Sequence, residues 1–463
     1  MTHVRRLLLS AATAALMGGA ADAVWAEDAA VGTAPAAQVS GPVDPRDARY
    51  VEMQMQMQAL AEEVRALREE RAADRKAMET VQVAAAAQPK VAWKGGPEFS
   101  GPGGATFKVR GRLLADAVFQ SWEPQNPLVA DLDTRELRGR QMFLGVEGKI
   151  GDHWAYKLEG GWVNGGTPSW DDAYLEFRPN KNASIIFGNA KATGLENITS
   201  TRFLTFMERG PYANVAGLDY NMGIIGRYWG KNWSITGAVQ GETLNSVDVI
   251  GEEQLSGVAR VTFAPVLTKT TTAHIGLWGR IRDHGTGAAF GYTPRPSTAF
   301  IPGGAYALRG AGSIGDGDTT LGLEGLFMHG PFSVQGEYVH IDIDPIAVGP
   351  DPSANAGYLQ GSWFIGGTRS YAVPTGDVGR PKIGKSLGDG GKGALELAAR
   401  WDFANFDDSP LAGDYSGFTL GANYYPNPYV RFMLNYVNGS QDNPIGVDDI
   451  DVQVLQGRAQ LDF

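Results

Sequence analysis

From residue 107 to the C-terminus, polar and apolar side chains alternate with a period of two along one segment after another. Such alternation predicts β-strands with one polar and one apolar face, because successive side chains of a strand point to opposite sides of its sheet. In the first segment Lys108, Arg110 and Arg112 share the polar face, and in the last segment Arg458 and Gln460 do so. We therefore expect this region to be an all-β domain.

Alternation by itself also fits a soluble sandwich, in which apolar faces meet in a core. Three further features favour a transmembrane barrel, with lipid against the apolar face and water inside. The segments are long, often about ten residues or more, and short turns alternate with long loops. Aromatic side chains also gather beside the short turns, as they do at membrane interfaces. These aromatic residues are Trp154, Tyr228, Trp229, Trp233, Tyr425, Tyr429 and Phe463.

The pattern predicts an antiparallel transmembrane β-barrel of sixteen strands, with the barrel domain at residues 106–463. An even strand number brings both ends of the barrel to the periplasmic side, where the short turns then also lie. Sixteen strands enclose a water-filled lumen, whereas an eight-stranded barrel is filled by its own side chains. The strands are expected at residues 106–120, 138–150, 153–164, 170–179, 182–191, 219–230, 232–241, 254–264, 270–282, 319–330, 331–342, 356–367, 391–405, 415–426, 428–438 and 450–463.

The first 26 residues have the features of a secretory signal peptide, with Arg5 and Arg6 before an apolar stretch and then small residues. Cleavage is expected after Ala26, with Ala23 as the alternative. The competing interpretation is a buried or membrane helix. Together with the absence of cysteine, a signal peptide fits a cell-envelope protein that needs no disulfide.

Between the signal and the barrel lies a predicted helix at residues 47–83, flanked by a flexible spacer at 27–46 and a linker at 84–105. Apolar residues recur along it in steps of four and three, which is typical of a coiled coil. They are Met53, Met57, Leu60, Val64, Leu67, Met78 and Val81. Arg71 and Asp74 interrupt this seam. A single solvated helix is the alternative.

Several segments resemble the phosphate-selective porin O and P family, and the resemblance covers about residues 100–463. They are residues 143–149 (FLGVEGK), 172–177 (DAYLEF), 200–209 (STRFLTFMER), 379–382 (GRPK), 396–400 (ELAAR), 430–437 (VRFMLNYV) and 455–463 (LQGRAQLDF). The resemblance implies a sixteen-stranded homotrimeric porin that passes small anions such as phosphate or polyphosphate. The terminal Phe463 is similar to the signal that the barrel-assembly machinery recognises.

The same resemblance implies that three connections fold into the lumen. They are the third and fifth outer loops, at residues 192–218 and 283–318, and the long periplasmic connection at residues 368–390. A pore selects anions by fixed positive charge at its narrowest part, and the planar fork of arginine can hold two phosphate oxygens. The candidate pore-lining cations are Arg110, Arg112, Arg202, Arg209, Arg280, Arg282, Arg380, Lys382, Lys385, Arg400, Arg431 and Arg458.

Two alternatives compete with anion selectivity. Arginines of the lumen can instead pair with acids on the same faces, such as Glu159 and Glu396, and so stiffen the wall. The net charge of −11 suits a general or weakly cation-selective channel, with the helix at 47–83 as a periplasmic trimer clamp or envelope tether.

The remaining function classes have little support in the sequence. A lipid-hydrolysing barrel would need a serine beside an outward histidine such as His340, and no such constellation is recognisable. We find no metal-ligand spacing, phosphate-cradling glycine loop or cofactor motif, and we expect no nucleic-acid partner. The sequence therefore predicts a non-enzymatic channel in the outer membrane, surrounded by lipid, with its N-terminal segment in the periplasm.

Overall fold

The computed structural model describes residues 45–87, 90–246, 254–285, 289–347, 351–409, 412–444 and 448–463. The predicted signal peptide and nearly all of the predicted spacer lie outside the described residues. The chain divides into two compact units, residues 1–81 and residues 82–463. In the first unit the described residues belong to one long helix, α1 (Pro45–Ala87). No helix in the described part of the chain is long and apolar enough to cross a membrane.

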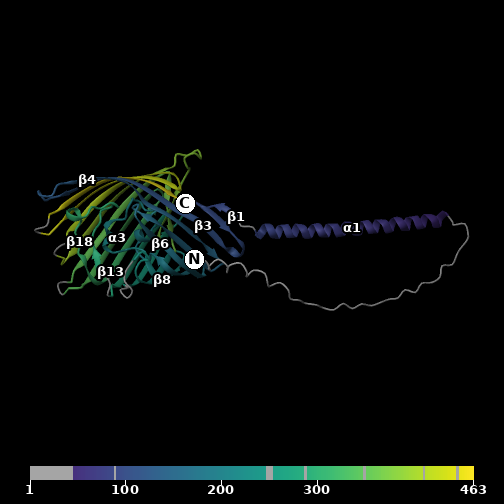
Figure 1. Ribbon diagram of the computed structural model, residues 1–463, viewed down its shortest axis with the longest axis horizontal. Helices are drawn as coiled ribbons and strands as arrows, with labels where there is room; N and C mark the ends of the chain where they lie inside the picture. The colour runs from purple at the N-terminus through teal and green to yellow at the C-terminus, as the bar shows by residue number, and fades with distance from the viewer. Residues whose placement is uncertain are drawn as a thin grey trace, which may run out of the picture. The chain divides into compact units, whose positions relative to one another are not determined.

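The second unit is a closed barrel of sixteen antiparallel strands, which confirms the predicted fold class (Figure 1). The last strand pairs with the first and closes the barrel, with Leu455 opposite Phe119. The barrel strands are β3 (Thr106–Pro124), β4 (Leu132–Ile150), β5 (Trp154–Val163), β6 (Thr167–Asn180), β7 (Ala183–Ala190), β8 (Asn221–Trp229), β9 (Trp233–Gln240), β10 (Leu255–Leu267), β11 (Thr271–Asp283), β13 (Gly312–His329), β14 (Phe332–Pro345), β15 (Ser353–Ile365), β18 (Ala394–Asp407), β19 (Asp414–Asn427), β20 (Val430–Asp442) and β21 (Ile450–Asp462).

The other strands and helices of this unit lie in the connections between barrel strands or before the first of them. A hairpin of β1 and β2 pairs with the start of β3, and short β12 pairs with β13. Strands β16 and β17 form a separate two-stranded sheet. These elements are β1 (Lys90–Trp93), β2 (Pro97–Ser100), β12 (Phe290–Tyr292), β16 (Gly367–Ala372), β17 (Asp377–Ile383), the helices α2 (Leu195–Ile198) and α3 (Pro211–Val215), and the short turns η1 (Pro102–Gly104) and η2 (Gly304–Tyr306).

The C-terminal residue is built into the barrel wall. The backbone N–H of Phe463 donates to the Gly111 carbonyl at 3.0 Å, and the Gly111 N–H donates to the Phe463 carbonyl at 2.9 Å. A Cβ atom at position 111 would lie 2.7 Å from the Phe463 ring. Glycine is therefore required at position 111 for the last side chain to close against the first strand.

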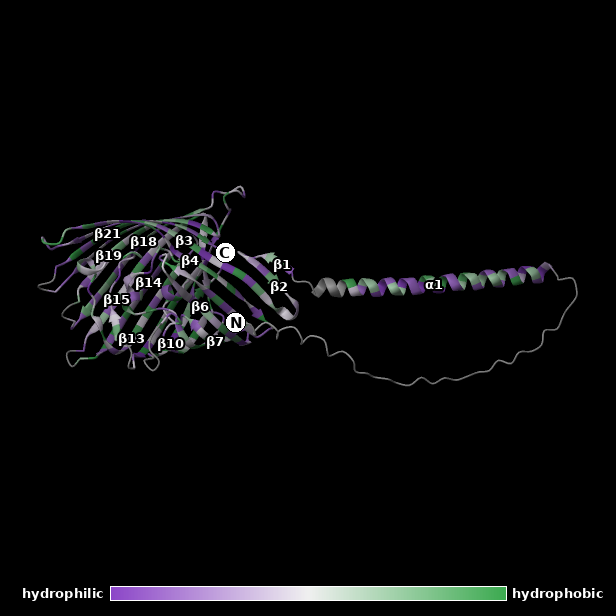
Figure 2. Ribbon diagram, viewed as in Figure 1, coloured by the Kyte–Doolittle hydropathy of each residue, from purple (hydrophilic) through white to green (hydrophobic). Residues whose placement is uncertain are grey.

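Over most of each strand the outward face is apolar and the inward face is polar, so green and purple alternate along the strands in Figure 2. On β11, for example, Ile275, Leu277 and Ile281 are exposed on the outside, whereas His274 and Arg280 are buried inside. This arrangement reverses the pattern of a soluble domain and suits a wall with lipid outside.

The alternation inverts toward the end of the barrel that carries the long loops, which we call the loop end. On β14, Val339, Ile341 and Ile343 point inward and are buried, while His340 and Asp342 point outward. Strand β21 changes in the same way, with buried Val452 and Val454 preceding buried Gln456 and Arg458. The inward apolar residues pack against loops inside the barrel. Strands therefore continue past the lipid-facing band, which explains why β4 and β13 begin earlier than predicted.

Three connections fill much of the interior. Loop 3 (residues 191–220) joins β7 to β8, and loop 5 (residues 284–311) joins β11 to β13. The third, the inserted hairpin (residues 366–393), joins β15 to β18 at the opposite end, which we call the turn end, and contains β16 and β17. Side chains of the wall hydrogen-bond to all three, as Arg431 does to loop 3 and Arg260 to the hairpin.

Candidate functional site

Loop 3 is anchored to the inner wall by one carboxylate. Glu337 on β14 accepts hydrogen bonds from the backbone N–H groups of Leu195 and Glu196, each at 2.7 Å. The hydroxyls of Tyr212 and Tyr358 also donate to it, at 2.8 and 2.6 Å. Two of the N–H groups that a helix leaves unpaired at its start are thereby satisfied. This carboxylate fixes both α2 and α3 of loop 3 against the wall.

Three predicted pore residues hold the same loop from nearby strands of the wall, β18, β20 and β21. Arg400 donates to Glu196 at 3.1 Å and to the Glu208 carbonyl at 3.3 Å. Arg431 donates to the Leu204 carbonyl at 2.6 Å. Arg458 binds both oxygens of Asp116 and also reaches Glu208 at 2.7 Å. These arginines act as ties between the wall and loop 3.

Glu208 is the acidic centre of one tie. It lies between Arg458 and Arg140, whose guanidinium reaches both of its oxygens at 3.0 and 2.9 Å. Burial alone would raise its pKa, but the charges of Arg140 and then Arg458 hold the pKa of Glu208 at about 2. The group is therefore charged at neutral pH.

A second carboxylate hub joins loop 3 to strands β3 and β5. Glu159, only 1% exposed, is 2.8 Å from Arg110, 2.9 Å from Arg112 and 3.0 Å from Arg202. Arg110 and Arg112 have further acidic partners, Glu147 and Asp171. With Glu147 and Asp171 included, three acids balance the three arginines of this cluster.

Two arginines connect the inserted hairpin to the wall, one on the wall and one on the hairpin. Arg260 donates to the carbonyls of Thr375 and Gly376 at 2.5 and 3.0 Å and pairs with Glu324. Arg369 of the hairpin grips both oxygens of Glu396, each at 2.8 Å, and also donates to a loop 3 carbonyl. The hairpin and loop 3 are consequently packed against each other inside the barrel.

Between the wall, loop 3 and the hairpin lies a cavity of about 430 Å³, which we call the basic chamber. Its lining contains seven cations and three acids. The cations are Lys108, Arg110, Lys157, Lys191, Arg202, Arg227 and Arg380, and the acids are Glu147, Asp172 and Asp377. The chamber therefore has a positive excess although the chain as a whole has a net charge of −11.

Two chamber cations, Lys191 and Arg227, form no ion pair with a carboxylate among the described residues. Arg227 donates to the Lys191 carbonyl at 3.1 Å. The Lys191 ammonium donates to the Asn197 carbonyl at 3.3 Å and lies 4.3 Å from the centre of the Tyr220 ring. Arg209 donates to the same Asn197 carbonyl at 3.0 Å. These two chamber cations are therefore available to an anion.

The environment of Lys191, in loop 3, weakens its hold on a proton. Burial, followed by the nearby charge of Arg209, lowers the pKa of Lys191 to about 7. On the inserted hairpin, burial raises the pKa of Asp377 to about 6, against a hydrogen bond from Thr375 and the charges of Arg260 and Arg227. Both groups thus titrate close to neutral pH.

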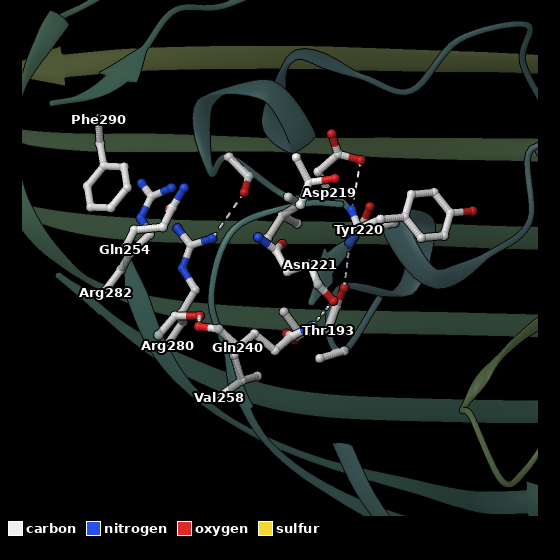
Figure 3. Close-up of a pocket in the computed structure, with 16 residues that line it drawn as sticks. Thr193, Asp219, Tyr220, Asn221, Gln240, Gln254, Val258, Arg280, Arg282 and Phe290 are labelled. Atoms are coloured by element: carbon white, nitrogen blue, oxygen red, sulfur yellow. Dashed lines mark hydrogen bonds between the residues drawn. The ribbon is translucent and has the colours of Figure 1, made fainter. Parts of the chain in front are cut away.

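A smaller cavity of about 200 Å³, the outer cavity, lies beside the chamber (Figure 3). Figure 3 shows Arg280 and Arg282 near Phe290, with Tyr220 across the space. Both arginines share Asp318, and Arg280 also donates to the Ala216 carbonyl at 2.7 Å. Tyr220 lines both cavities and so lies at the boundary between them.

The twelve predicted pore residues are distributed among five environments. Arg110, Arg202 and Arg380 line the basic chamber, and Arg280 and Arg282 line the outer cavity. Arg112 is buried against Glu159 and Asp171. Exposed Lys382 and Lys385 lie on the inserted hairpin and line neither cavity. Arg209, Arg400, Arg431 and Arg458 bond within loop 3 or tie it to the wall.

The sequence reasoning missed Lys191, Arg227 and Tyr220. Arg227 could have been found, because it shares the inward face of β8 with buried Ile225. Lys191 and Tyr220 lie just outside β7 and β8, where alternation no longer indicates direction. How close Lys191 and Tyr220 lie to each other depends on the path of loop 3.

No metal site appears in the described part of the chain. No group of three or more His, Asp or Glu side chains there is arranged to hold a metal ion. His340 points outward near the loop end and bonds to Asn355 at 2.9 Å and to Asp342 at 3.1 Å. It thus bonds to an amide and an acid.

Comparison with known proteins places this geometry in a wider group. Residues 107–463 match the family described as phosphate-selective porin O and P. An uncharacterized protein of Caulobacter vibrioides is 26% identical over 399 residues, which cover 82% of this chain and 78% of the relative. Porin O of Pseudomonas aeruginosa is 25% identical over 396 residues, covering 75% of this chain and 86% of the relative.

Among solved structures, a loop-deleted form of OmpT, an outer membrane protein of Vibrio cholerae, is similar to this barrel. The TM-score is 0.50 at 12% sequence identity, and the match covers 78% of this chain and 100% of that chain. At this level of identity the likeness concerns the fold alone.

Proposed function

This chain belongs to the phosphate-selective porin O and P family of outer-membrane channels, and from that premise we propose that it passes small anions, with phosphate as a preferred solute. The turn end with its inserted hairpin faces the periplasm, and the loop end faces the exterior. The protein is a homotrimer, as the resemblance to the family implies. The C-terminal strand ending at Phe463 is the segment that the barrel-assembly machinery recognises.

The basic chamber is the observation that supports anion passage. Most other lumen arginines are paired with acids, which neutralise their positive charge. Lys191 and Arg227 differ, because their hydrogen-bond and ring partners are carbonyl groups and an aromatic ring. An anion entering the chamber gains two charge-assisted hydrogen-bond donors without displacing a carboxylate.

The two cavities suggest how an anion moves. Arg280 and Arg282 of the outer cavity meet it first, and their pairing with Asp318 limits how tightly they hold it. The anion then passes Tyr220 and reaches Lys191, which contacts the ring. Conduction requires each site to release the ion as well as to bind it. Partial neutralisation by Asp172 and Asp377 keeps the chamber from becoming a trap.

Phosphate titrated into chloride solution is expected to block the single-channel chloride current. The block should weaken roughly tenfold in Arg380→Ala, which corresponds to the loss of one charge-assisted contact. The change also leaves the negative charge of Asp462 at the chamber wall without its cationic partner. Lys382→Ala is the matched control, since it removes a cation from the same hairpin outside the chamber.

If neither phosphate nor sulfate blocks the current at any accessible concentration, the anion site does not exist. Equal block by phosphate and sulfate would retain anion passage and remove phosphate preference. Reversal potentials in a potassium chloride gradient separate the remaining alternative, because a general or cation-leaning channel would show no preference for chloride.

The preference for chloride over potassium is expected to rise as pH falls from about 8 to about 5.5, through the pKa values of about 7 for Lys191 and about 6 for Asp377. Lys191 is neutral above its pKa and gains positive charge below it. Asp377 is negative above its pKa and loses that charge below it. Both protonations make the chamber more positive, so the two steps add.

Reversal potentials measured in potassium chloride across this pH range test the expectation, because chloride itself does not titrate. Lys191→Met should remove the step near pH 7 and keep the lower one, and Asp377→Asn should do the reverse. A wild-type profile that is flat between these pH values would contradict this account of the chamber.

A further inference from the structure

Helix α1 carries an exposed apolar row that nothing within its own unit covers. It is one uninterrupted helix of 43 residues, about 65 Å long at 1.5 Å per residue. Leu60 and Met78 on this row are 64% and 68% exposed. Banding along the coloured part of α1 in Figure 2 shows apolar residues between charged ones. A lone helix that leaves its apolar stripe in water gains little stability from it.

The row follows heptad positions a and d without a break in spacing. Met57, Val64, Arg71 and Met78 occupy position a, each seven residues after the last. Position d is occupied by Met53, Leu60, Leu67, Asp74 and Val81. This 3.5-residue repeat winds helices around one another in a left-handed supercoil.

The charges that flank the row determine what can pair with it. Glu63 and Glu70 occupy position g, and Arg68 and Arg75 occupy position e. In a parallel, in-register pair, each g residue meets the e residue five positions later on the neighbouring helix. Glu63 then faces Arg68, and Glu70 faces Arg75. In an antiparallel pair glutamate would face glutamate and arginine would face arginine. The flanking charges therefore complement another copy of α1 only in parallel.

The polar interruption fixes the register of that pairing. Arg71 at a and Asp74 at d are adjacent layers of opposite charge, so identical helices in register bring the two layers together. A shift by one heptad would place Arg71 against Val64 or Met78 of the neighbour, which leaves a charge in an apolar layer. Polar layers within an apolar seam specify register at some cost in stability.

We propose that α1 binds the α1 helices of other copies of this chain, forming a parallel, in-register coiled coil in the periplasm. The coiled coil has as many helices as the assembly has barrels, three in the proposed homotrimer. It holds the copies together through a segment separate from the barrel and leaves the basic chamber unchanged.

Cysteine cross-linking tests the proposal without background, because the chain contains no cysteine. Full-length Leu60→Cys and Met78→Cys, in separate preparations of the protein in its membrane, are mildly oxidised. Both should form disulfide-linked pairs of the chain at least about tenfold more than Glu62→Cys, whose position f faces away from the seam and beyond disulfide reach. An antiparallel arrangement can bring at most one of the two seam positions opposite itself.

A charge exchange provides the second test. Glu63→Arg with Glu70→Arg should reduce the cross-linking of Leu60→Cys, and adding Arg68→Glu with Arg75→Glu should restore it. Cross-linking of Leu60→Cys no greater than that of Glu62→Cys, or adducts to a different protein in its place, would overturn the proposal. Single-channel conductance should be the same in all these variants, so that a failure here is distinct from a failure of the channel proposal.

Discussion

Lys191→Glu is expected to invert the ion preference of the channel, from chloride to potassium. At about pH 6, below the pKa of about 7 of Lys191, the substitution changes the charge of the basic chamber by two at the point where it borders the outer cavity. Two unit charges about 4 Å apart interact by about 4 kcal/mol at the effective dielectric of a partly wet site. An attraction of that size for a passing anion becomes a repulsion. The sign of the reversal potential in a potassium chloride gradient reports the change directly.

Lys191→Met separates loss of the charge from its reversal. Removing one charge-assisted donor costs about 1.5–3 kcal/mol, which corresponds to roughly 10- to 100-fold weaker phosphate block of the chloride current. Lys181→Glu is the matched control, because this exposed lysine lies in the turn between β6 and β7 and lines neither cavity. An unchanged preference in Lys191→Glu would show that ions bypass the basic chamber.

The barrel could be predicted from the sequence because its determinant is local. The side chains of each strand indicate its two faces, as Ile275 and Arg280 do on β11. Glycine and proline indicate where the turns lie. The alternation predicts that the polar face lies inside and the apolar face outside along the whole of each strand. This assignment is wrong at the loop end, where Val339 and Ile341 face inward. There the outer face meets water and the inner face meets packed loops, so the physical reason for the pattern reverses.

The candidate site could be predicted only in part, because it depends on contacts between distant segments. Residue type alone does not separate Arg431, which ties loop 3 to the wall, from Arg227, which lines the basic chamber. The difference arises from which carbonyls and carboxylates the folded loop brings near each side chain. Lys191 is the clearest case, since its contacts with Asn197 and Tyr220 exist only once loop 3 turns inward.

Glu337→Gln is expected to release loop 3 and to give frequent sojourns at a higher single-channel conductance. The carboxylate accepts from two backbone N–H groups and two tyrosine hydroxyls. An amide keeps one accepting oxygen and directs an NH₂ group at donors that formerly bonded to the other. Lost hydrogen bonds and one buried N–H without a partner together weaken the anchor by about 2–4 kcal/mol. The released state then becomes roughly 30- to 1000-fold more populated.

The size of the effect should follow the number of bonds removed. Tyr212→Phe deletes one of the four donors, so it should raise the frequency of wide openings by about tenfold or less. Glu136→Gln is the matched control, because it neutralises an acid on β4 that pairs with Arg138 away from loop 3. Wide openings should also respond less to phosphate, since Lys191 and Arg202 move away with the loop. Wild-type conductance in Glu337→Gln would mean that the ties through Arg400, Arg431 and Arg458 suffice, and that loop 3 is held mainly from β18, β20 and β21.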